Sequence, residues 1–108
     1  MYNQKLRDAL CEYYEEAGVV EEDQALLFGP SGAYDNSIIG FTDNGRAVYD
    51  YNRMIDELME DDGISAEEAQ DWIDYNTIRS IPYYGEHAPI VIGLSVEALM
   101  DIYGKEGK

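Results

Sequence analysis

The chain has 108 residues, with 23 Asp or Glu against 7 Lys or Arg, which gives a formal net charge of −16. Its length fits a single domain, residues 1–108, built around one hydrophobic core. The charge disfavours direct binding to a nucleic-acid backbone or an anionic membrane, and it favours a basic protein as the partner. No stretch is apolar enough for a signal peptide or a membrane span, so we expect a cytoplasmic protein.

The first part of the chain predicts a helix followed by a short apolar run. Residues 2–17 carry apolar side chains at helical spacing, and Gly18 is placed to end that helix. Cys11 is the only cysteine, which excludes an intrachain disulfide, and its place on the helix predicts a half-buried side chain. Residues 25–28 are apolar, and we interpret them as a candidate edge strand.

Two β-prone runs, residues 37–42 and 46–51, flank the sequence Asp43-Asn44-Gly45. An Asn-Gly pair tolerates the positive φ angles that tight hairpin turns require. The pattern therefore predicts a β-hairpin over residues 37–51. A further buried strand is predicted at residues 90–94, where the sequence is almost entirely apolar.

Two helices are predicted between the hairpin and the last strand. Apolar side chains recur at helical spacing over residues 52–61, and Gly63 is placed to cap the end of this helix. Ser65-Ala66-Glu67-Glu68 is a capping box, so a second helix starts at Ala66. We expect it to end near residues 79–81, because Pro82 disfavours helical geometry in the residue before it. Its expected inward-facing side chains are Ala69, Trp72, Ile73 and Asn76.

The last predicted element is a short helix over residues 96–103, capped by Ser95. Together the elements predict an α+β fold with a small, mostly antiparallel sheet packed on one face by about four helices. The sheet is expected to contain the hairpin 37–51, the strand 90–94 and the candidate strand 25–28.

Negative charge is concentrated in residues 50–74, where ten carboxylates accompany a single basic residue, Arg53. The acidic residues of both helices recur at spacings of three and four, so each set covers one outer face. One interpretation is a solvated face that keeps the protein soluble, although a net charge of about 2 to 8 usually suffices for that. The other is a surface that imitates a phosphate backbone and occupies a basic groove on another protein. Its predicted contact residues are Asp56, Glu57, Glu60, Asp61, Asp62, Glu67, Glu68, Asp71, Asp74 and Tyr75.

The sequence shows no catalytic or metal-binding constellation. Asp61-Asp62-Gly63 and Asp43-Asn44-Gly45 do not match the alternating oxygen ligands of a calcium loop. His87 has no second histidine or cysteine nearby, so we expect a surface histidine and not a metal ligand. Neither a phosphate-binding loop nor a base beside a nucleophile is recognisable. We therefore expect no enzymatic activity, no metal and no cofactor.

Ten tyrosines against two phenylalanines are an unusual bias. Tyrosines can pack at the edge of a core with their hydroxyls toward water, and they are also enriched at the contact hot spots of protein interfaces. This leaves an alternative function, an intracellular interaction or regulatory module that binds through residues 81–89. In that case the acidity serves solubility, and Tyr83 and Tyr84 carry the contact.

Five segments between Tyr34 and Pro89 carry a resemblance to known proteins: YDNSIIGF, RAVYDY with the preceding Gly45, MIDELMEDDG, EEAQDWIDYNTIR and IPYYGEHAP. They are similar to small uncharacterised proteins of gut bacteria and of their phages and mobile elements, a resemblance that implies no active site or ligand. In size and acidity the chain also resembles anti-CRISPR proteins, some of which block the DNA-binding groove of a Cas nuclease as DNA mimics. This likeness of character, not of motif, implies a Cas nuclease or another defence nuclease as the basic partner.

Overall fold

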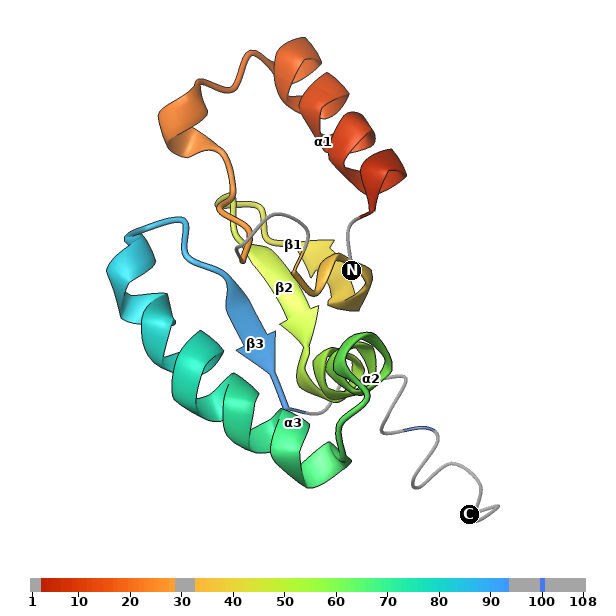
Figure 1. Cartoon of the computed structure of the whole chain (residues 1–108). Helices are drawn as coiled ribbons and strands as arrows, with labels where there is room; N and C mark the ends of the chain where they lie inside the picture. The colour runs from red at the N-terminus through yellow and green to blue at the C-terminus, as the bar shows by residue number, and fades with distance from the viewer. Residues whose placement is uncertain (1–2, 29–32, 94–99, 101–108) are drawn as a thin grey trace.

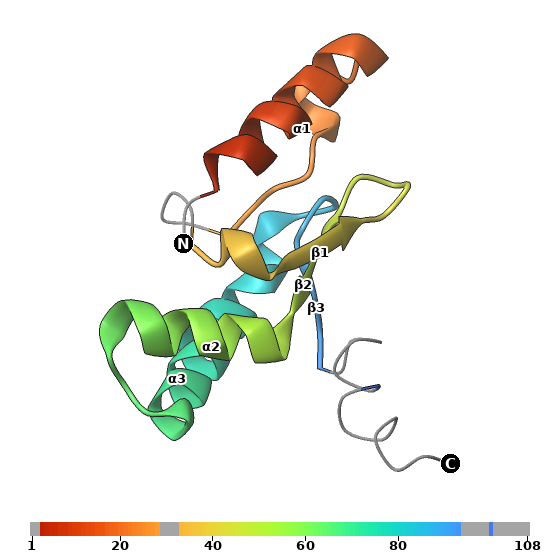
Figure 2. The same ribbon diagram turned by 90° about the vertical axis from the view of Figure 1, so that its right-hand side faces the viewer.

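The computed structural model describes residues 3–28, 33–93 and 100 (Figure 1). Helix α1 lies at one end of the molecule and helices α2 and α3 at the other, with the sheet between them (Figures 1 and 2). The fold of the described residues is α+β, with three α-helices and a three-stranded mixed sheet. The helices are α1 (Gln4–Ala17), α2 (Tyr51–Asp62) and α3 (Ala66–Trp72), and the strands are β1 (Ile38–Phe41), β2 (Ala47–Asp50) and β3 (Ile90–Ile92).

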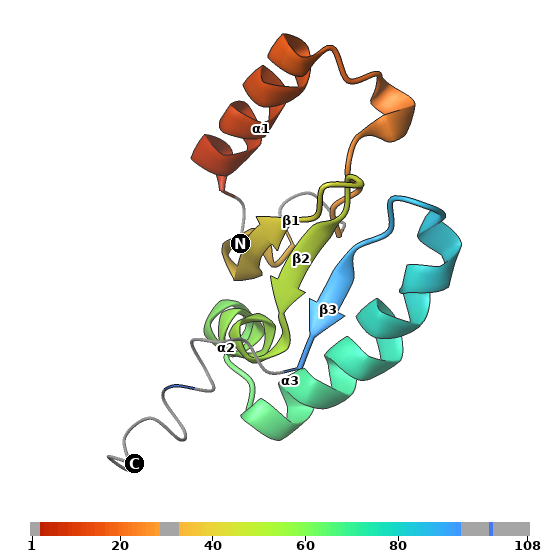
Figure 3. The ribbon, with the colours of Figure 1, turned by 180° about the vertical axis from the view of Figure 1, so that it is seen from behind.

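The strand order is β1-β2-β3, with β1 antiparallel to β2 and β2 parallel to β3. The predicted hairpin is confirmed. Its backbone closes with Thr42 donating to the carbonyl of Arg46 at 2.8 Å, and of the residues in the turn only Gly45 has a positive φ, +81°. The prediction of a mostly antiparallel sheet is wrong, because β3 returns beside β2 in the same direction. A parallel pair needs a long crossover, which α2, α3 and the helical turns after α3 supply (Figure 3).

Residues 25–28 do not form the predicted edge strand. Two of their backbone N–H groups donate to tyrosine hydroxyls instead, Ala25 to Tyr14 at 2.9 Å and Phe28 to Tyr49 at 3.0 Å. Because buried N–H groups need one partner each, hydroxyls that satisfy them remove the need for a neighbouring strand. The segment is held in an irregular conformation that delivers the Phe28 ring to the core.

The core lies where the sheet, α2 and the end of α3 meet. Its contiguous buried residues are Phe28, Tyr34, Ala47, Tyr49, Met54 and Ile73. The predicted apolar face of α2 is confirmed, since Met54 is fully buried and its neighbours Ile55 and Leu58 pack against this cluster. Phe28 and Tyr49 have their ring centroids 4.7 Å apart, so tyrosine serves as a core residue with its hydroxyl hydrogen-bonded.

The predicted ends of α1 and α2 and the predicted start of α3 are confirmed. Gly18 and Gly63 end α1 and α2 in the left-handed conformation, with φ of +70° and +64°. Both hydrogen bonds of the capping box that starts at Ser65 are present. At the start of α2, the Asp50 side chain accepts from the N–H of Asn52 at 3.2 Å and is buried, so this carboxylate of the acidic stretch does not reach the surface.

The helical path continues beyond α3 in two other geometries. A π-helical turn, Ile73–Thr77, is followed by a 3₁₀ helix, Ile78–Tyr84. The predicted end near residues 79–81 is therefore wrong, since the 3₁₀ helix runs through Pro82. A proline lacks the N–H that would donate to an earlier carbonyl, but its fixed φ is compatible with this tighter helix.

The π-helical turn changes which side chains face the core. The N–H of Ile78 donates to the carbonyl of Ile73, which inserts one residue and rotates the following side chains by about 100°. Ile78 thereby packs against the core, whereas Asn76 is exposed, contrary to the prediction. Trp72 was also predicted to face inward, but 55% of its surface is exposed.

Three further expectations concern the ends of the molecule and its surface. Cys11 is exposed and not half-buried. Apart from Met100, the predicted helix over residues 96–103 lies outside the described residues, as does Leu94 of the predicted strand. Within the described ranges, no helix has both the length and the apolar character needed to cross a membrane.

Candidate functional site

The predicted acidic contact residues are almost all at the surface. Of the nine carboxylates predicted on α2 and α3, eight are exposed and only Glu57 is half-buried. We call the exposed set the acidic surface. It comprises Asp56, Glu60, Asp61, Asp62, Glu67, Glu68, Asp71 and Asp74.

Three of the predicted carboxylates have structural roles. Glu57 accepts a hydrogen bond from the Ser37 hydroxyl at 2.7 Å, which joins α2 to the residues before β1. Glu68 closes the capping box at the start of α3. Asp74 accepts from the Tyr51 hydroxyl at 2.6 Å, and burial together with this bond raises the pKa of Tyr51 to about 12.

Other carboxylates are without an ion pair among the described residues. Within residues 3–28 and 33–93, Asp56, Glu60, Asp62, Glu67 and Asp71 form no ion pair. Asp56 with Glu60, and Glu67 with Asp71, are like-charged pairs one helical turn apart, each of which destabilises its helix by a few tenths of a kcal/mol, about 0.2–0.5. The local structure does not compensate this charge, so it is directed to solvent or to a partner.

Two aromatic side chains stand among these carboxylates. Trp72 and Tyr75 lie on the helical segment after Glu68, and 69% of the Tyr75 surface is exposed. The Arg79 guanidinium stacks over the Tyr75 ring, 4.8 Å from its centroid. Tyr75 was predicted as a contact residue, whereas Trp72 was missed because the periodicity of α3 placed it inward. The sequence did contain a signal for the exposure of Trp72. It lies four residues after Glu68 and three before Tyr75, a spacing that forms one stripe on a helix.

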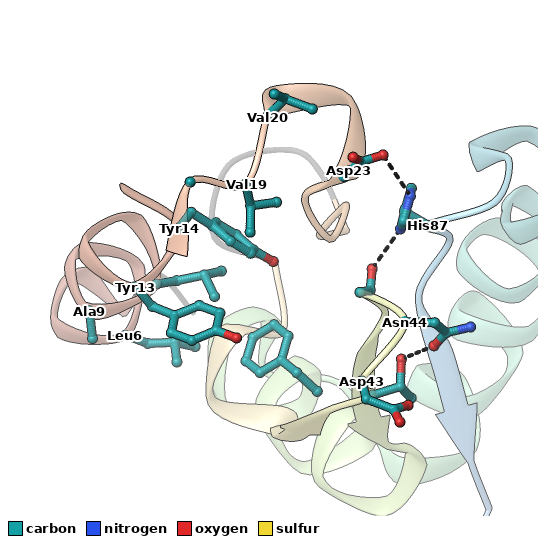
Figure 4. A pocket seen from close by; sticks show the side chains of 15 residues that line it. Leu6, Ala9, Tyr13, Tyr14, Val19, Val20, Asp23, Asp43, Asn44 and His87 are labelled. Carbon is teal, nitrogen blue, oxygen red and sulfur yellow. Dashed lines mark hydrogen bonds and ion pairs between the residues drawn. The ribbon is translucent and has the colours of Figure 1, made fainter. Parts of the chain in front are cut away.

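The structure also contains a feature that sequence patterns did not reveal, a groove of about 990 Å³ between α1 and the hairpin (Figure 4). Leu6 and Tyr13 point from α1 toward the hairpin, and Asp23 and His87 lie on the far side. Because 62% of the Tyr13 surface is exposed, this is an open groove and not an enclosed cavity. We call it the α1 groove, and its principal apolar lining residues are Leu6, Leu10, Tyr13, Val20 and Phe41.

One wall of the α1 groove is held by a buried ion pair. The Arg7 guanidinium donates two hydrogen bonds to Asp35, both 2.7 Å long, and the backbone N–H of Asn3 donates a third at 2.8 Å. The Asp35 side chain is fully buried. Burial opposes its ionisation, but Arg7 and the Asn3 N–H outweigh burial and hold the pKa of the Asp35 carboxyl below its usual value.

The opposite wall is held by His87. Its Nδ1 lies 3.0 Å from the carbonyl oxygen of Gly45, and its Nε2 lies 3.9 Å from Asp23. Since a carbonyl can only accept, Nδ1 carries the hydrogen. The expectation of a surface histidine is wrong, because His87 is half-buried and joins the hairpin turn to the segment after α1. Within the described ranges, no three His, Cys, Asp or Glu residues cluster in a way that could hold a metal ion.

The segment proposed as the alternative contact, residues 81–89, is largely structural. The Tyr84 ring packs edge-on against Phe28, with centroids 5.9 Å apart, and Ala88 and Pro89 are buried. Pro82, Tyr83, Gly85 and Glu86 are exposed, and Tyr83 is the most exposed large side chain of the segment, with 90% of its surface exposed. A contact through this segment would therefore depend on Tyr83.

Comparison with known proteins finds no matching family model, no matching curated protein and no matching solved structure.

Proposed function

We propose that this chain is an inhibitor that binds another protein, presenting the acidic surface in place of nucleic acid and occupying a basic nucleic-acid-binding groove. A Cas nuclease or another defence nuclease is the first partner class to test. The observation that carries the proposal is the set of eight exposed carboxylates on α2, α3 and the π-helical turn after α3, five of which form no ion pair with a described residue.

The charge of the acidic surface favours one class of partner, a protein with a basic groove. A protein that binds nucleic acid lines its groove with Lys and Arg, and a surface of uncompensated carboxylates is complementary to such a groove. The like-charged pairs on α2 and α3 destabilise the free protein. A cationic partner would relieve this repulsion on binding.

The exposed aromatic residues support the same function. Grooves that bind nucleic acid contact phosphates through basic side chains and bases through stacking surfaces. Trp72 and Tyr75 are exposed on the same helical segment as Asp71 and Asp74, so this segment offers both charge and stacking area. Trp and Tyr are also the side chains that most often carry binding energy at protein interfaces.

The test is binding to a purified Cas nuclease loaded with its guide RNA, together with inhibition of DNA cleavage. Reversal of Asp56, Glu60, Glu67 and Asp71 to Lys should abolish both. Wild-type association should also slow steeply as salt is added, because electrostatic steering is screened. These four side chains are exposed. After reversal each helix still has one like-charged pair at the same spacing, so we expect the variant to fold.

A matched control carries the same change in net charge elsewhere. Reversal of the exposed Glu12, Glu15, Glu16 and Glu22 to Lys also raises the formal charge of −16 by eight units. It should leave most of the inhibition in place. Equal loss in both variants would show that only total charge matters, and unchanged binding after reversal on α2 and α3 would refute the proposal.

One observation favours a second candidate function, an interaction module that binds through residues 81–89. Tyr83 is nine-tenths exposed although its neighbour Tyr84 is packed against the core. For this function, Tyr83→Ala should weaken partner binding while the reversals on α2 and α3 leave it intact. The same two variants therefore separate the candidates.

A further inference from the structure

The α1 groove lies at the opposite end of the molecule from α2 and α3, so it is separate from the acidic surface (Figures 1 and 4). Three of the large apolar side chains that remain exposed in the described chain gather around it: Tyr13, Val20 and Phe41. They come from α1, from the segment after it and from β1. Exposed apolar side chains from three segments that line one groove are typical of a surface that another molecule covers.

Helix α1 itself needs such cover. A helix of 14 residues is marginally stable alone, and helices in proteins gain most of their stability by burying an apolar face. The apolar face of α1 points into the groove, where Leu6 and Leu10 remain half-buried and Tyr13 stays mostly exposed. The protein contacts this face only in part, which leaves room of about 990 Å³ along it.

The charge around the groove restricts what can fill it. Asp23 and Asp43 line it, and no Lys or Arg does so in the part of the chain that the structure describes. A second copy of this chain would bring a formal charge of −16 toward these carboxylates and would be repelled. A partner segment with apolar side chains, and with Lys or Arg beside them, is complementary both to the apolar lining of the groove and to the carboxylates of Asp23 and Asp43.

We propose that the α1 groove is a second docking site that takes an amphipathic, cationic peptide segment of a partner protein. The apolar side chains of the segment cover Leu10, Tyr13 and Phe41, and its basic side chains approach Asp23 and Asp43. This site works independently of the acidic surface on α2 and α3. A partner that contacted both would gain affinity from the link between them.

The test uses a synthetic helical peptide with Leu at positions i, i+3, i+4 and i+7 and Lys at the other positions, titrated into isotope-labelled full-length protein. The amide signals of α1, of the hairpin turn and of His87 should shift, and those of α2 and α3 should not. A peptide with Glu in place of Lys should bind at least about tenfold more weakly, as should one with Ser in place of Leu.

Matched variants make the result specific to the groove. Phe41→Ser and Tyr13→Ser should each lower the affinity for the Leu–Lys peptide about tenfold, since central apolar contacts carry most of the binding energy. Ile39→Ser is the control on the same strand, and Tyr83→Ser the control for an exposed tyrosine; both should stay within about twofold of wild type. All four side chains are substantially exposed, and thermal melts verify that each variant is folded.

Three outcomes would overturn the proposal. In the first, the peptide shifts the amide signals of α2 and α3, and these shifts disappear in the variant whose carboxylates on α2 and α3 are reversed to Lys. The acidic surface would then be the site that binds the peptide. The second is a concentration-dependent dimer that Tyr13→Ser abolishes, which would assign the groove to a second copy. The third is an anionic apolar dye that fills the groove when the Leu–Lys peptide does not. None of them bears on inhibition through the acidic surface, which is measured separately.

Discussion

Replacement of Asp35 by Asn tests whether one buried ion pair holds α1, and with it a wall of the α1 groove, against the protein. Asp35 accepts two hydrogen bonds from Arg7 and one from the backbone of Asn3, and its side chain is fully buried. A second polar contact of α1 is the bond from the Ala25 N–H to the Tyr14 hydroxyl. Loss of the carboxylate should therefore release the helix.

The expected magnitude follows from the geometry of the pair. Removing one partner of a buried ion pair costs about 3–5 kcal/mol, because the other charge is left uncompensated. Arg7 keeps 24% of its side chain exposed and can regain part of its hydration, so we expect about 2–3 kcal/mol. This energy corresponds to a fall of about 30- to 150-fold in the protection of the α1 amides against hydrogen exchange.

The assay is hydrogen exchange followed by NMR at neutral pH, read separately for α1, α2 and α3. Glu12→Gln is the matched control, because it removes one negative charge from the exposed side of α1 and should change protection little. Protection should fall in α1 and much less in α2 and α3. Unchanged α1 protection would show that the pair contributes nothing, and an equal fall in all helices would show that α1 unfolds only with the whole domain.

The same pair predicts a pH dependence. The pKa of the Asp35 carboxyl is lower in the folded protein than in the unfolded chain. The stabilisation is therefore complete above the ordinary carboxyl pKa of about 4 and is lost as the pH falls through the lower folded value. The difference in α1 protection between wild type and Asp35→Asn should be constant from about pH 7 to about pH 5 and should shrink below about pH 4.

Further predictions concern the hairpin turn, the core and the overall charge. Gly45→Ala should lower the free energy of unfolding by about 1–3 kcal/mol in urea denaturation, because Gly45 has φ +81° and an added Cβ would lie 3.0 Å from the backbone oxygen of Asp23. Tyr84→Ala should cost about 2 kcal/mol through lost packing on Phe28, whereas Tyr83→Ala should change stability by less than about 0.5 kcal/mol; equal effects would contradict the packing described. Sodium chloride should raise the melting temperature at neutral pH by screening repulsion among the carboxylates, and a melting temperature that does not rise would show that they are already compensated.

Features set by neighbours in the chain were predictable. The capping box at Ser65, the helix ends at Gly18 and Gly63 and the hairpin around Gly45 depend on residues within about one turn of each other, so short patterns contain the information. The exposure of the carboxylates on α2 and α3 was predictable for the same reason. A charged side chain without a buried partner stays in water wherever its helix packs.

Features set by distant residues were not predictable in this way. Asn76 follows an α-helical period that the π-helical turn at Ile73–Thr77 breaks. The apolar sequence of residues 25–28 is typical of a strand, but two of their N–H groups donate hydrogen bonds to the hydroxyls of Tyr14 and Tyr49. In both cases the local pattern is compatible with two conformations, and partners elsewhere in the fold select one of them.

The sequence by itself therefore determined α1, α2, the start of α3, the hairpin and the concentration of negative charge on α2 and α3, because these depend on local spacing and on the hydration of carboxylates. Only the tertiary structure decided that β3 runs parallel to β2, that Trp72 stands beside the carboxylates and that α1 leaves a groove. These features require contacts between residues far apart in the chain, such as Arg7 with Asp35 and Gly45 with His87. Local propensities do not encode such contacts, since their stability comes from burial and pairing that exist only after the chain has folded.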